Sequence, residues 1–307
     1  MSEHKNYNNY KGGQHGKPRE GNPNRQNHTP QPQEIPYSEV GNLGLLFTRR
    51  YFEKIKVEMV DDPKGKVAEK YYREHNDNII AQSKASIGRN GVPSLPNNVA
   101  NSQFELTTCY PGLITGIGIS HSSGQKNEAK LGLSFDHTTG LPFIPGSSVK
   151  GLLRSTFPAP RKDNERERCD FIREKIEKEL SDDEIKRLCI EIFGSDNKDK
   201  DNHIQGSDFF FDAFPVSAKN GLLDLDYITP HTGGEFSEPT PIQFMRIKPE
   251  VKFRFSFKLT STKLSETVTV EPKDKEKLFK AILTTVGIGA KTNVGYGQLK
   301  EDVKTKQ

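Results

Sequence analysis

Regular alternation of apolar and polar residues marks one segment of the chain more clearly than any other. In residues 251–259 every odd position is apolar and every even position is polar. This pattern is typical of an antiparallel strand with one buried and one open face, because successive side chains point to opposite sides of a strand. We therefore expect Lys252, Arg254 and Lys258 to share the open face.

Shorter strand and helix patterns lie on either side of this segment. Apolar and β-branched runs predict strands over residues 104–110, 113–119, 207–216, 222–228 and 239–249, and a closing strand near 297–300. Helical spacing predicts helices over 149–157 and 274–286, and two charged helices within 163–193. This order predicts an α+β fold, with a ferredoxin-like antiparallel sheet and helices on one face.

Three segments with different compositions define the predicted domain organisation. Residues 1–36 consist mainly of Asn, Gln, Gly, His, Pro and Lys, which predicts a disordered polar tail. Residues 37–103 contain two helical patterns followed by a Gly/Pro/Asn-rich stretch, which predicts a helical prefix and a loop. Residues 104–307 form the main domain, with a helical insertion at 160–203 that contains the capping box Ser181-Asp-Asp-Glu184.

The composition excludes several classes of protein. Of the 307 residues, 32% are hydrophobic and 28% are charged, and the longest apolar runs are too short to cross a bilayer or act as a signal peptide. We therefore expect a cytoplasmic protein with no membrane partner. The three cysteines, Cys109, Cys169 and Cys189, are widely spaced and form no CxxC motif, which argues against a disulfide framework and a zinc ribbon. We therefore expect free thiols and no metal site.

Positive charge is concentrated in the last third of the chain. The whole sequence has a net charge of only +4, which does not by itself indicate nucleic-acid binding. Residues 243–300, however, contain twelve Lys or Arg against five Asp or Glu, a net charge of +7. This local excess is what a phosphate-binding surface needs, although a solvated strand and helix face has the same composition.

A glycine-rich loop within this basic segment is the first candidate binding site. Its sequence is Gly287-Ile-Gly-Ala-Lys-Thr-Asn-Val-Gly-Tyr-Gly297, which fits neither the Walker A motif nor the dinucleotide-binding motif. Glycines still allow backbone amides to approach a polyanion closely, and an ordinary tight turn is the alternative. The candidate residues are Gly287, Gly289, Lys291, Thr292, Asn293, Gly295 and Gly297.

The segment Pro145-Gly-Ser-Ser-Val-Lys-Gly-Leu-Leu-Arg154 is the second candidate site. Its start predicts a helix N-terminus with unpaired amides, where the backbone dipoles favour an anion such as phosphate. Lys150 and Arg154 are four residues apart and share one face of this helix, and Gly151 leaves room beside them. Ser147, Ser148, Lys150 and Arg154 are therefore candidate RNA contacts, with a capped helix bearing a solvated basic face as the alternative.

Several motifs together resemble the RAMP superfamily of CRISPR proteins. Besides the two candidate sites, four further motifs are similar to the family of sixth subunits of Cmr-type (type III-B) effector complexes. They are Phe135-Asp-His-Thr-Thr-Gly-Leu-Pro-Phe-Ile-Pro145, Asp212-Ala-Phe-Pro215, Asp226-Tyr-Ile-Thr-Pro-His231 and Pro239-Thr-Pro-Ile-Gln-Phe244. The resemblance covers roughly residues 104 to 300. It implies an RRM-related ferredoxin-like fold in a ribonucleoprotein with other subunits. It also implies binding of guide RNA near its 3′ end and of the guide–target RNA duplex, without a cofactor and without catalysis.

Two enzymatic interpretations remain as alternatives. His137, next to Asp136, and His231 have the chemistry for acid–base cleavage of RNA, as in the guide-processing endonucleases of the RAMP superfamily. Asp136 and Asp226 are weaker candidates for acids that cleave target RNA. A nucleotide-binding enzyme depends only on the glycine loop and loses support because both phosphate-binding motifs fail. We favour non-catalytic binding, with His137, His231, Lys252 and Arg254 as further candidates for positions near RNA.

Overall fold

The computed structural model describes residues 41–61, 65–90, 92, 94–116, 123–129, 133–158, 164–195, 204–229 and 241–302. All of these residues belong to one compact unit, Pro36–Gln307. The tail predicted over residues 1–36 lies outside the described residues.

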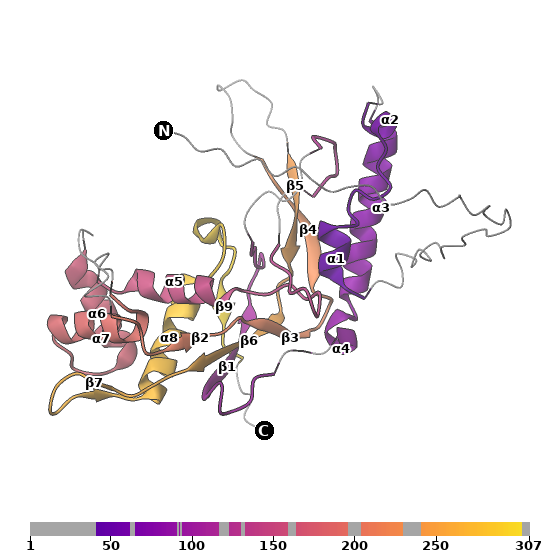
Figure 1. Ribbon diagram of the computed structural model, residues 1–307. Coiled ribbons are helices and arrows are strands. Elements are labelled where there is room, and N and C mark those ends of the chain that lie inside the picture. The colour runs from indigo at the N-terminus through magenta and orange to yellow at the C-terminus, as the bar shows by residue number, and fades with distance from the viewer. Residues whose placement is uncertain are drawn as a thin grey trace, which may run out of the picture. The chain divides into compact units, whose positions relative to one another are not determined.

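A sheet of five antiparallel strands forms the centre of this unit (Figure 1). The strands are β1 (Ser102–Thr108), β2 (Phe209–Phe210), β3 (Phe214–Ala218), β6 (Val251–Lys258) and β9 (Leu299–Lys300). Strand β6 pairs with β1 on one side and with β2 and β3 on the other, and β9 extends the sheet beyond β1. The predicted mixture of helices and antiparallel strands is therefore confirmed.

Two helices, α5 (Gly146–Thr156) and α8 (Pro272–Val286), pack against one face of this sheet. Phe253, Phe255 and Phe257 of β6 are buried there, and the Phe257 ring lies 5.5 Å from the ring of Phe279 on α8. Burying each of these aromatic side chains contributes about 2–3 kcal/mol to folding. The alternation in residues 251–259 therefore identifies the buried face of β6 correctly, although Ser256 on the opposite face is also buried.

A buried ion pair connects helix α8 to the start of β2. Lys275 Nζ lies 2.7 Å from Asp208 Oδ2, and both side chains are fully buried. Burial lowers the pKa of Lys275, whereas the hydrogen bond to Asp208 opposes that change. The other carboxylate oxygen, Asp208 Oδ1, accepts hydrogen bonds from the backbone amide and the hydroxyl of Thr260, just after β6. The pair therefore ties α8, β2 and β6 together.

The predicted helical insertion consists of α6 (Glu165–Ile176) and α7 (Asp182–Phe193), which lie beside α5 and α8 (Figure 1). The capping box is confirmed: the Ser181 hydroxyl accepts from the Glu184 amide, and the Glu184 carboxylate accepts from the Ser181 amide. Cys169 and Cys189 are buried and Cys109 is half-buried, and all three are free thiols, as predicted.

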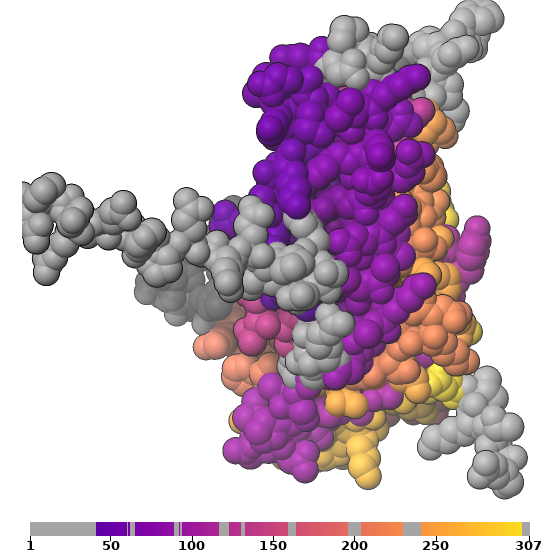
Figure 2. All heavy atoms as spheres, turned by 90° about the vertical axis from the view of Figure 1, so that its right-hand side faces the viewer, coloured from indigo at the N-terminus to yellow at the C-terminus, as the bar shows by residue number. Residues whose placement is uncertain are grey.

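The predicted helical prefix packs beside a separate hairpin. The prefix contains α1 (Leu43–Thr48), α2 (Val57–Val60), α3 (Lys66–Ser83) and α4 (Ser86–Asn90), and the hairpin consists of β4 (Leu223–Ile228) and β5 (Ile242–Ile247). Helix α3 contacts β4, and Figure 2 shows the prefix as one surface next to the hairpin. The hydroxyl of buried Tyr51 donates to Asn76 Oδ1 and accepts from the Ala129 amide, so the prefix belongs to the common core.

Two strand predictions differ from the structure. The apolar run at 113–119 is not a strand where it is described: Leu113 forms an isolated bridge with Ile247, and residues 117–119 lie outside the described residues. The run at 207–216 is divided into β2 and β3, because Asp212 and Ala213 leave the pairing with β6 and Ala213 pairs with Ile144 instead. A further small hairpin, β7 (Thr262–Lys263) and β8 (Thr269–Val270), follows β6.

Candidate nucleic-acid interface

The glycines of the loop at 287–297 allow its two ends to meet. Gly297 has φ 76°, and a Cβ at this position would overlap the carbonyl oxygen of Ile288. Across the same contact, the Ile288 amide donates to the Gly297 carbonyl at 2.9 Å. No side chain fits between these two backbone segments, so the turn interpretation accounts for Gly297.

The closed loop is bound to the segment that follows β1. The Gly297 amide donates to the Gly112 carbonyl at 2.7 Å, and the Ala290 amide donates to the Ile114 carbonyl at 3.0 Å. A Cβ at Gly289 would overlap that same Ile114 oxygen. The glycines thus bring the loop into direct backbone contact with residues 112–114, which explains why the described part of the apolar run, residues 113–116, does not form the predicted strand.

Four backbone amides of the loop are left open by this arrangement. The amides of Gly289, Lys291, Thr292 and Asn293 donate to no group among the described residues, although Thr292–Val294 form a short 3₁₀ turn. Asn293 is exposed, and the ammonium of Lys291 forms no ion pair with any described residue. The loop therefore combines the tight turn with a set of open donors that has the chemistry for binding an anion.

The N-terminus of α5 differs from the prediction of unpaired amides. The Gly146 amide donates to Asp212 Oδ1 at 2.7 Å, and the Ser148 and Val149 amides donate to the Pro145 carbonyl. Only the Ser147 amide of this first turn has no partner among the described residues. The break between β2 and β3 brings the Asp212 carboxylate to the positive end of the helix dipole, so the anion position there is already occupied by the protein itself.

One flank of α5 faces the glycine loop across a cleft of about 320 Å³. Ser148 and Leu152 contribute the helix side of the cleft, and Gly289 and Ala290 contribute the loop side. The segment after β1 completes the lining with Ile114, Thr115 and Gly116. The structure therefore brings the two candidate sites together, although they are separated by more than a hundred residues in the sequence.

Lys150 and Arg154 lie on the other flank of α5, about 160° and about 120° apart from Ser148 around the helix axis. Lys150 Nζ lies 5.9 Å from the centre of the Phe210 ring, and Arg154 Nη2 donates to the Gly194 carbonyl at 3.4 Å. Neither side chain lines the cleft. Gly151 lies between the two flanks on the outer surface, where a Cβ would meet nothing within 4 Å.

The open face of the central sheet is closer to neutral than the sequence indicates. Lys252 Nζ lies 2.5 Å from Asp302 Oδ2, and Arg254 Nη2 lies 2.9 Å from Glu105 Oε1. The hydrogen bond to Asp302 raises the pKa of Lys252 and lowers that of Asp302. Both of these candidate cations are therefore paired with carboxylates of the protein.

The same pairing extends through the basic segment 243–300. Seven of its twelve cations form ion pairs, namely Arg246, Lys252, Arg254, Lys275, Lys277, Lys280 and Lys300. Five form no ion pair with any described residue, namely Lys248, Lys258, Lys263, Lys273 and Lys291. Among these five, Lys291 belongs to the glycine loop, so the net charge of +7 overstates how much positive charge is available to a ligand.

The candidate acid–base residues have other partners or lie apart. The ring of exposed His137 forms no hydrogen bond with any described residue, and its backbone carbonyl accepts from Asn42 Nδ2 at 3.0 Å. Asp136 Oδ2 accepts from the amide and the hydroxyl of Thr139 at 2.7 and 2.8 Å, as in a local turn. His231 lies outside the described residues.

A polar network that the sequence analysis missed anchors the end of the glycine loop. The Tyr296 hydroxyl donates to Asp226 Oδ2 at 2.7 Å, and Arg246 Nε lies 3.0 Å from the same oxygen. The Arg246 guanidinium also donates to the Pro111 carbonyl. Burial, followed by the hydrogen bond to Asp226, raises the pKa of Tyr296. The network connects the glycine loop, the β4–β5 hairpin and the segment after β1. Its members are too far apart in the sequence for a local pattern to predict it.

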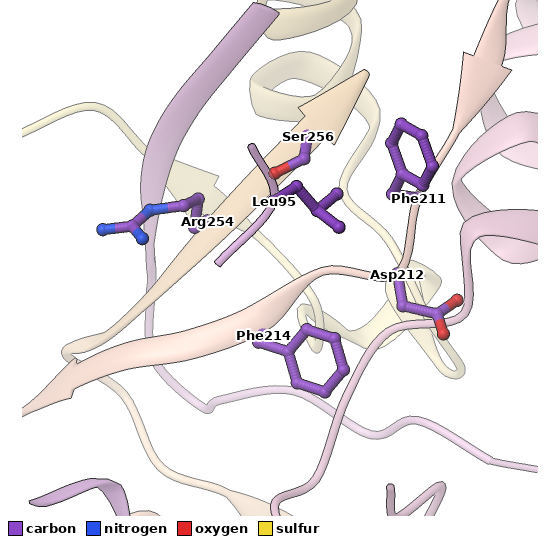
Figure 3. A pocket seen from close by; sticks show the side chains of 6 residues that line it. All are labelled: Leu95, Phe211, Asp212, Phe214, Arg254 and Ser256. Atoms are coloured by element: carbon purple, nitrogen blue, oxygen red, sulfur yellow. The ribbon is translucent and has the colours of Figure 1, made fainter. Parts of the chain in front are cut away.

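A second, smaller cavity of about 150 Å³ lies on the open face of the sheet (Figure 3). Its lining residues are Leu95, Phe211, Asp212, Phe214, Arg254 and Ser256. In Figure 3 the Arg254 guanidinium extends away from the two phenylalanine rings. The Asp212 carboxylate is engaged by the Gly146 amide. The cavity is therefore mainly apolar, and its two charged neighbours, Asp212 and Arg254, already have partners.

Metal and membrane sites were sought in the same described residues. They contain no group of three or more His, Cys, Asp or Glu side chains arranged to hold a metal ion. No helix in this part of the chain is long and apolar enough to cross a bilayer.

Comparison with known proteins identifies the family. Residues 105–300 match the RAMP superfamily, which is well over half of the chain. The chain therefore belongs to the RAMP superfamily, and the resemblance seen in its motifs is confirmed.

Two curated relatives are similar in sequence. A protein of Saccharolobus solfataricus named CRISPR system CMR subunit Cmr6 is 30% identical over 197 residues, which cover 63% of this chain and 55% of the relative. A Pyrococcus furiosus protein named CRISPR system Cmr subunit Cmr6 is 29% identical over 216 residues, 53% of this chain and 59% of that protein. The chain thus spans little more than half the length of the curated relatives it matches.

A solved structure is similar in fold. One chain of the type III-B Cmr-beta complex, determined by cryo-electron microscopy with cognate target RNA bound, superimposes with a TM-score of 0.50. The alignment has 28% sequence identity and covers 78% of this chain and 75% of that chain.

The loop geometry predicts opposite effects for two glycine substitutions. Gly297→Ala should lower the free energy of unfolding by about 2–4 kcal/mol, because it adds backbone strain and a steric overlap with the Ile288 carbonyl. Gly151→Ala, on the open outer surface of α5, should raise it by about 0.5–1 kcal/mol. Urea unfolding of the two variants and the wild type measures both changes in the free energy of unfolding. A Gly297→Ala protein as stable as wild type would contradict the close backbone contact.

Proposed function

We propose that this chain is an RNA-binding subunit of a type III-B CRISPR ribonucleoprotein effector complex. Its family supports this proposal, as do two relatives named as Cmr6 subunits and a similar chain in a Cmr complex bound to target RNA. The observation that carries the proposal is the cleft between Ser148 on α5 and Gly289 in the glycine loop. One residue from each of the two candidate phosphate-binding sites lines this cleft.

The chemistry of this region suits the sugar–phosphate backbone of RNA. The amides of Gly289 and of 291–293, which have no partner among the described residues, offer hydrogen bonds to phosphate oxygens, and Lys291 adds a positive charge that forms no ion pair there. Contacts of this kind carry no information about base sequence, which suits a subunit that must accept guides of different sequence. Lys150 and Arg154 then contact the RNA strand where it crosses the outer surface of α5, beside the open position at Gly151.

The finer assignments follow from the family resemblance. The RNA is the guide near its 3′ end together with the guide–target duplex, the partners are the other subunits of the complex, and the compartment is the cytoplasm. The domain is an RRM-related ferredoxin-like fold. The strand order β2-β6-β1-β9, with α5 after β1 and α8 after β6, supports this assignment, because it matches the alternation of strands and helices in that fold.

We infer that the subunit does not cleave RNA. General acid–base catalysis needs groups that are held close to one another and to the scissile bond. The His137 ring has no partner among the described residues, Asp136 is engaged by Thr139, and Asp226 is engaged by Tyr296 and Arg246. These contacts support structural roles for the two aspartates and solvent exposure for the histidine.

RNA binding should depend strongly on salt. Because phosphate contacts release counterions, the logarithm of the association constant should fall linearly with the logarithm of salt concentration. Lys291→Ala should weaken binding and reduce the slope by about 0.7, the value for one phosphate contact on a single strand. Fluorescence anisotropy of labelled single-stranded RNA with the full chain measures both quantities.

Lys277→Ala is the matched control for this experiment. It removes the same charge from a surface position on α8 where Lys277 pairs with Glu177, and it should leave the slope unchanged. Salt-independent binding, or equal losses in the two variants, would contradict the proposed interface.

Incubation of the full chain with guide-repeat RNA should leave the RNA intact. His137→Ala should therefore leave the RNA length distribution unchanged. Denaturing gel electrophoresis, with and without divalent metal, measures the products. Site-specific cleavage by the wild type that disappears in His137→Ala would establish the endonuclease alternative instead.

A further inference from the structure

Tyr110, just after β1, is 82% exposed, which makes it the most exposed of the large hydrophobic side chains in the described residues. Its ring packs on no other aromatic ring there, and its hydroxyl forms no hydrogen bond with a described residue. A tyrosine ring presents a large, rigid contact surface at low entropic cost. Its ring is therefore available to a ligand.

The backbone on both sides of Tyr110 is held firmly. The preceding residue, Cys109, donates its amide to the Gln298 carbonyl at 2.8 Å. The following residue, Pro111, accepts a hydrogen bond from Arg246, and Gly112 accepts one from the Gly297 amide. The ring therefore projects from a backbone that is already ordered. Stacking of a ligand on it costs little conformational entropy in the protein.

The glycine loop lies directly beside this position. A Cβ built on Gly295 would be 3.4 Å from the Pro111 ring, and the adjoining Val294 side chain is 62% exposed. Just before Val294 in the same turn are the amides of 291–293 and the ammonium of Lys291, none of which has a partner in the described part of the chain. An aromatic surface therefore borders a group of phosphate donors.

We propose that Tyr110 stacks an unpaired base of the RNA strand whose phosphate is bound by the glycine loop. The proposal rests on the proposed RNA-binding function and adds a base contact to it. Single-stranded nucleic-acid sites commonly combine a positively charged track with aromatic stacking, which tolerates any base because every base has a π face. Tyr110 follows β1 and is not part of the sheet face, so this contact differs from stacking on the sheet of an RRM.

The size and surroundings of the patch favour RNA over a protein partner. A stable protein interface buries about 800 Å² on each partner and has a core depleted of charge. The exposed apolar surface here consists of Tyr110 and Val294, and it borders Lys291 and open backbone amides. A single nucleotide, with one flat ring and one phosphate, fits these two neighbouring chemistries.

Anisotropy titrations with single-stranded RNA test the proposal. Tyr110→Ala should weaken binding about 5- to 150-fold, the range that corresponds to the loss of one stacked base. Tyr110→Phe should bind like the wild type, because the ring is retained. Phe209→Ala, which removes a 51% exposed aromatic side chain from β2 at the other edge of the sheet, should have no effect. Equal affinity of Tyr110→Ala and wild type would overturn the proposal.

Two further readouts separate base stacking from charge and from loss of folding. Tyr110→Ala should leave the salt slope unchanged, and the affinity difference should vanish on an abasic RNA of the same length. In the wild type, 2-aminopurine placed along the RNA should show quenched fluorescence at one position, and the quenching should disappear in Tyr110→Ala. If Tyr110→Ala weakened binding to the abasic RNA as much as to normal RNA, Tyr110 would not contact a base.

The outcomes also distinguish this proposal from the function on which it rests. Salt-dependent RNA binding that Tyr110→Ala leaves intact would sustain the interface and remove the stacking contact. Loss of partner subunits from the complex in Tyr110→Ala, with normal RNA binding, would assign the patch to a protein partner and overturn the proposal. Failure of the wild type to bind RNA would overturn both.

Discussion

The close backbone contact between Gly297 and Ile288, and the binding of their loop to residues 112–114, determine the geometry of the candidate interface. Because the loop closes without side chains between its ends, its amides at Ala290 and Gly297 reach the carbonyls of Ile114 and Gly112. That contact fixes one wall of the cleft against α5 and presents the amides of 291–293 outward. It also holds the backbone around Tyr110. A wider loop would separate the two candidate sites that the structure brings together.

Electrostatic pairing limits where this protein can bind a polyanion. The excess of positive charge in residues 243–300 is balanced in large part by carboxylates from other segments, such as Glu105, Asp208 and Asp302. A phosphate at these pairs would have to displace a carboxylate, which costs free energy for little gain. The N-terminus of α5 follows the same principle, since Asp212 already occupies it. The glycine loop, by contrast, offers backbone amides and Lys291, which have no partner among the described residues and which a strand of RNA can reach without such a cost.

Local patterns in the sequence predict the local structure well. The alternation in residues 251–259 identifies the buried face of β6, and Ser181 with Glu184 identifies the start of α7. The remaining features depend on pairs of residues distant in sequence. Asp212 reaches Gly146 only because the chain breaks between β2 and β3, and Tyr296 meets Asp226 only through the hairpin β4–β5. The periodicity of a single sequence contains no information on such pairs. Three features could therefore be found only in the structure: the occupied N-terminus of α5, the different surroundings of its two flanks, and the pairing of the cations with carboxylates.

Hydrogen–deuterium exchange of the full chain, with and without single-stranded RNA, tests the central claim most directly. If RNA binds across the cleft, amides at 287–297 and 109–116 and in the first turn of α5 should exchange more slowly in the complex. Helix α3, on the side formed by the prefix, should exchange at the same rate in both states. Protection confined to the prefix or to the open face of the sheet, with the glycine loop unchanged, would contradict the account.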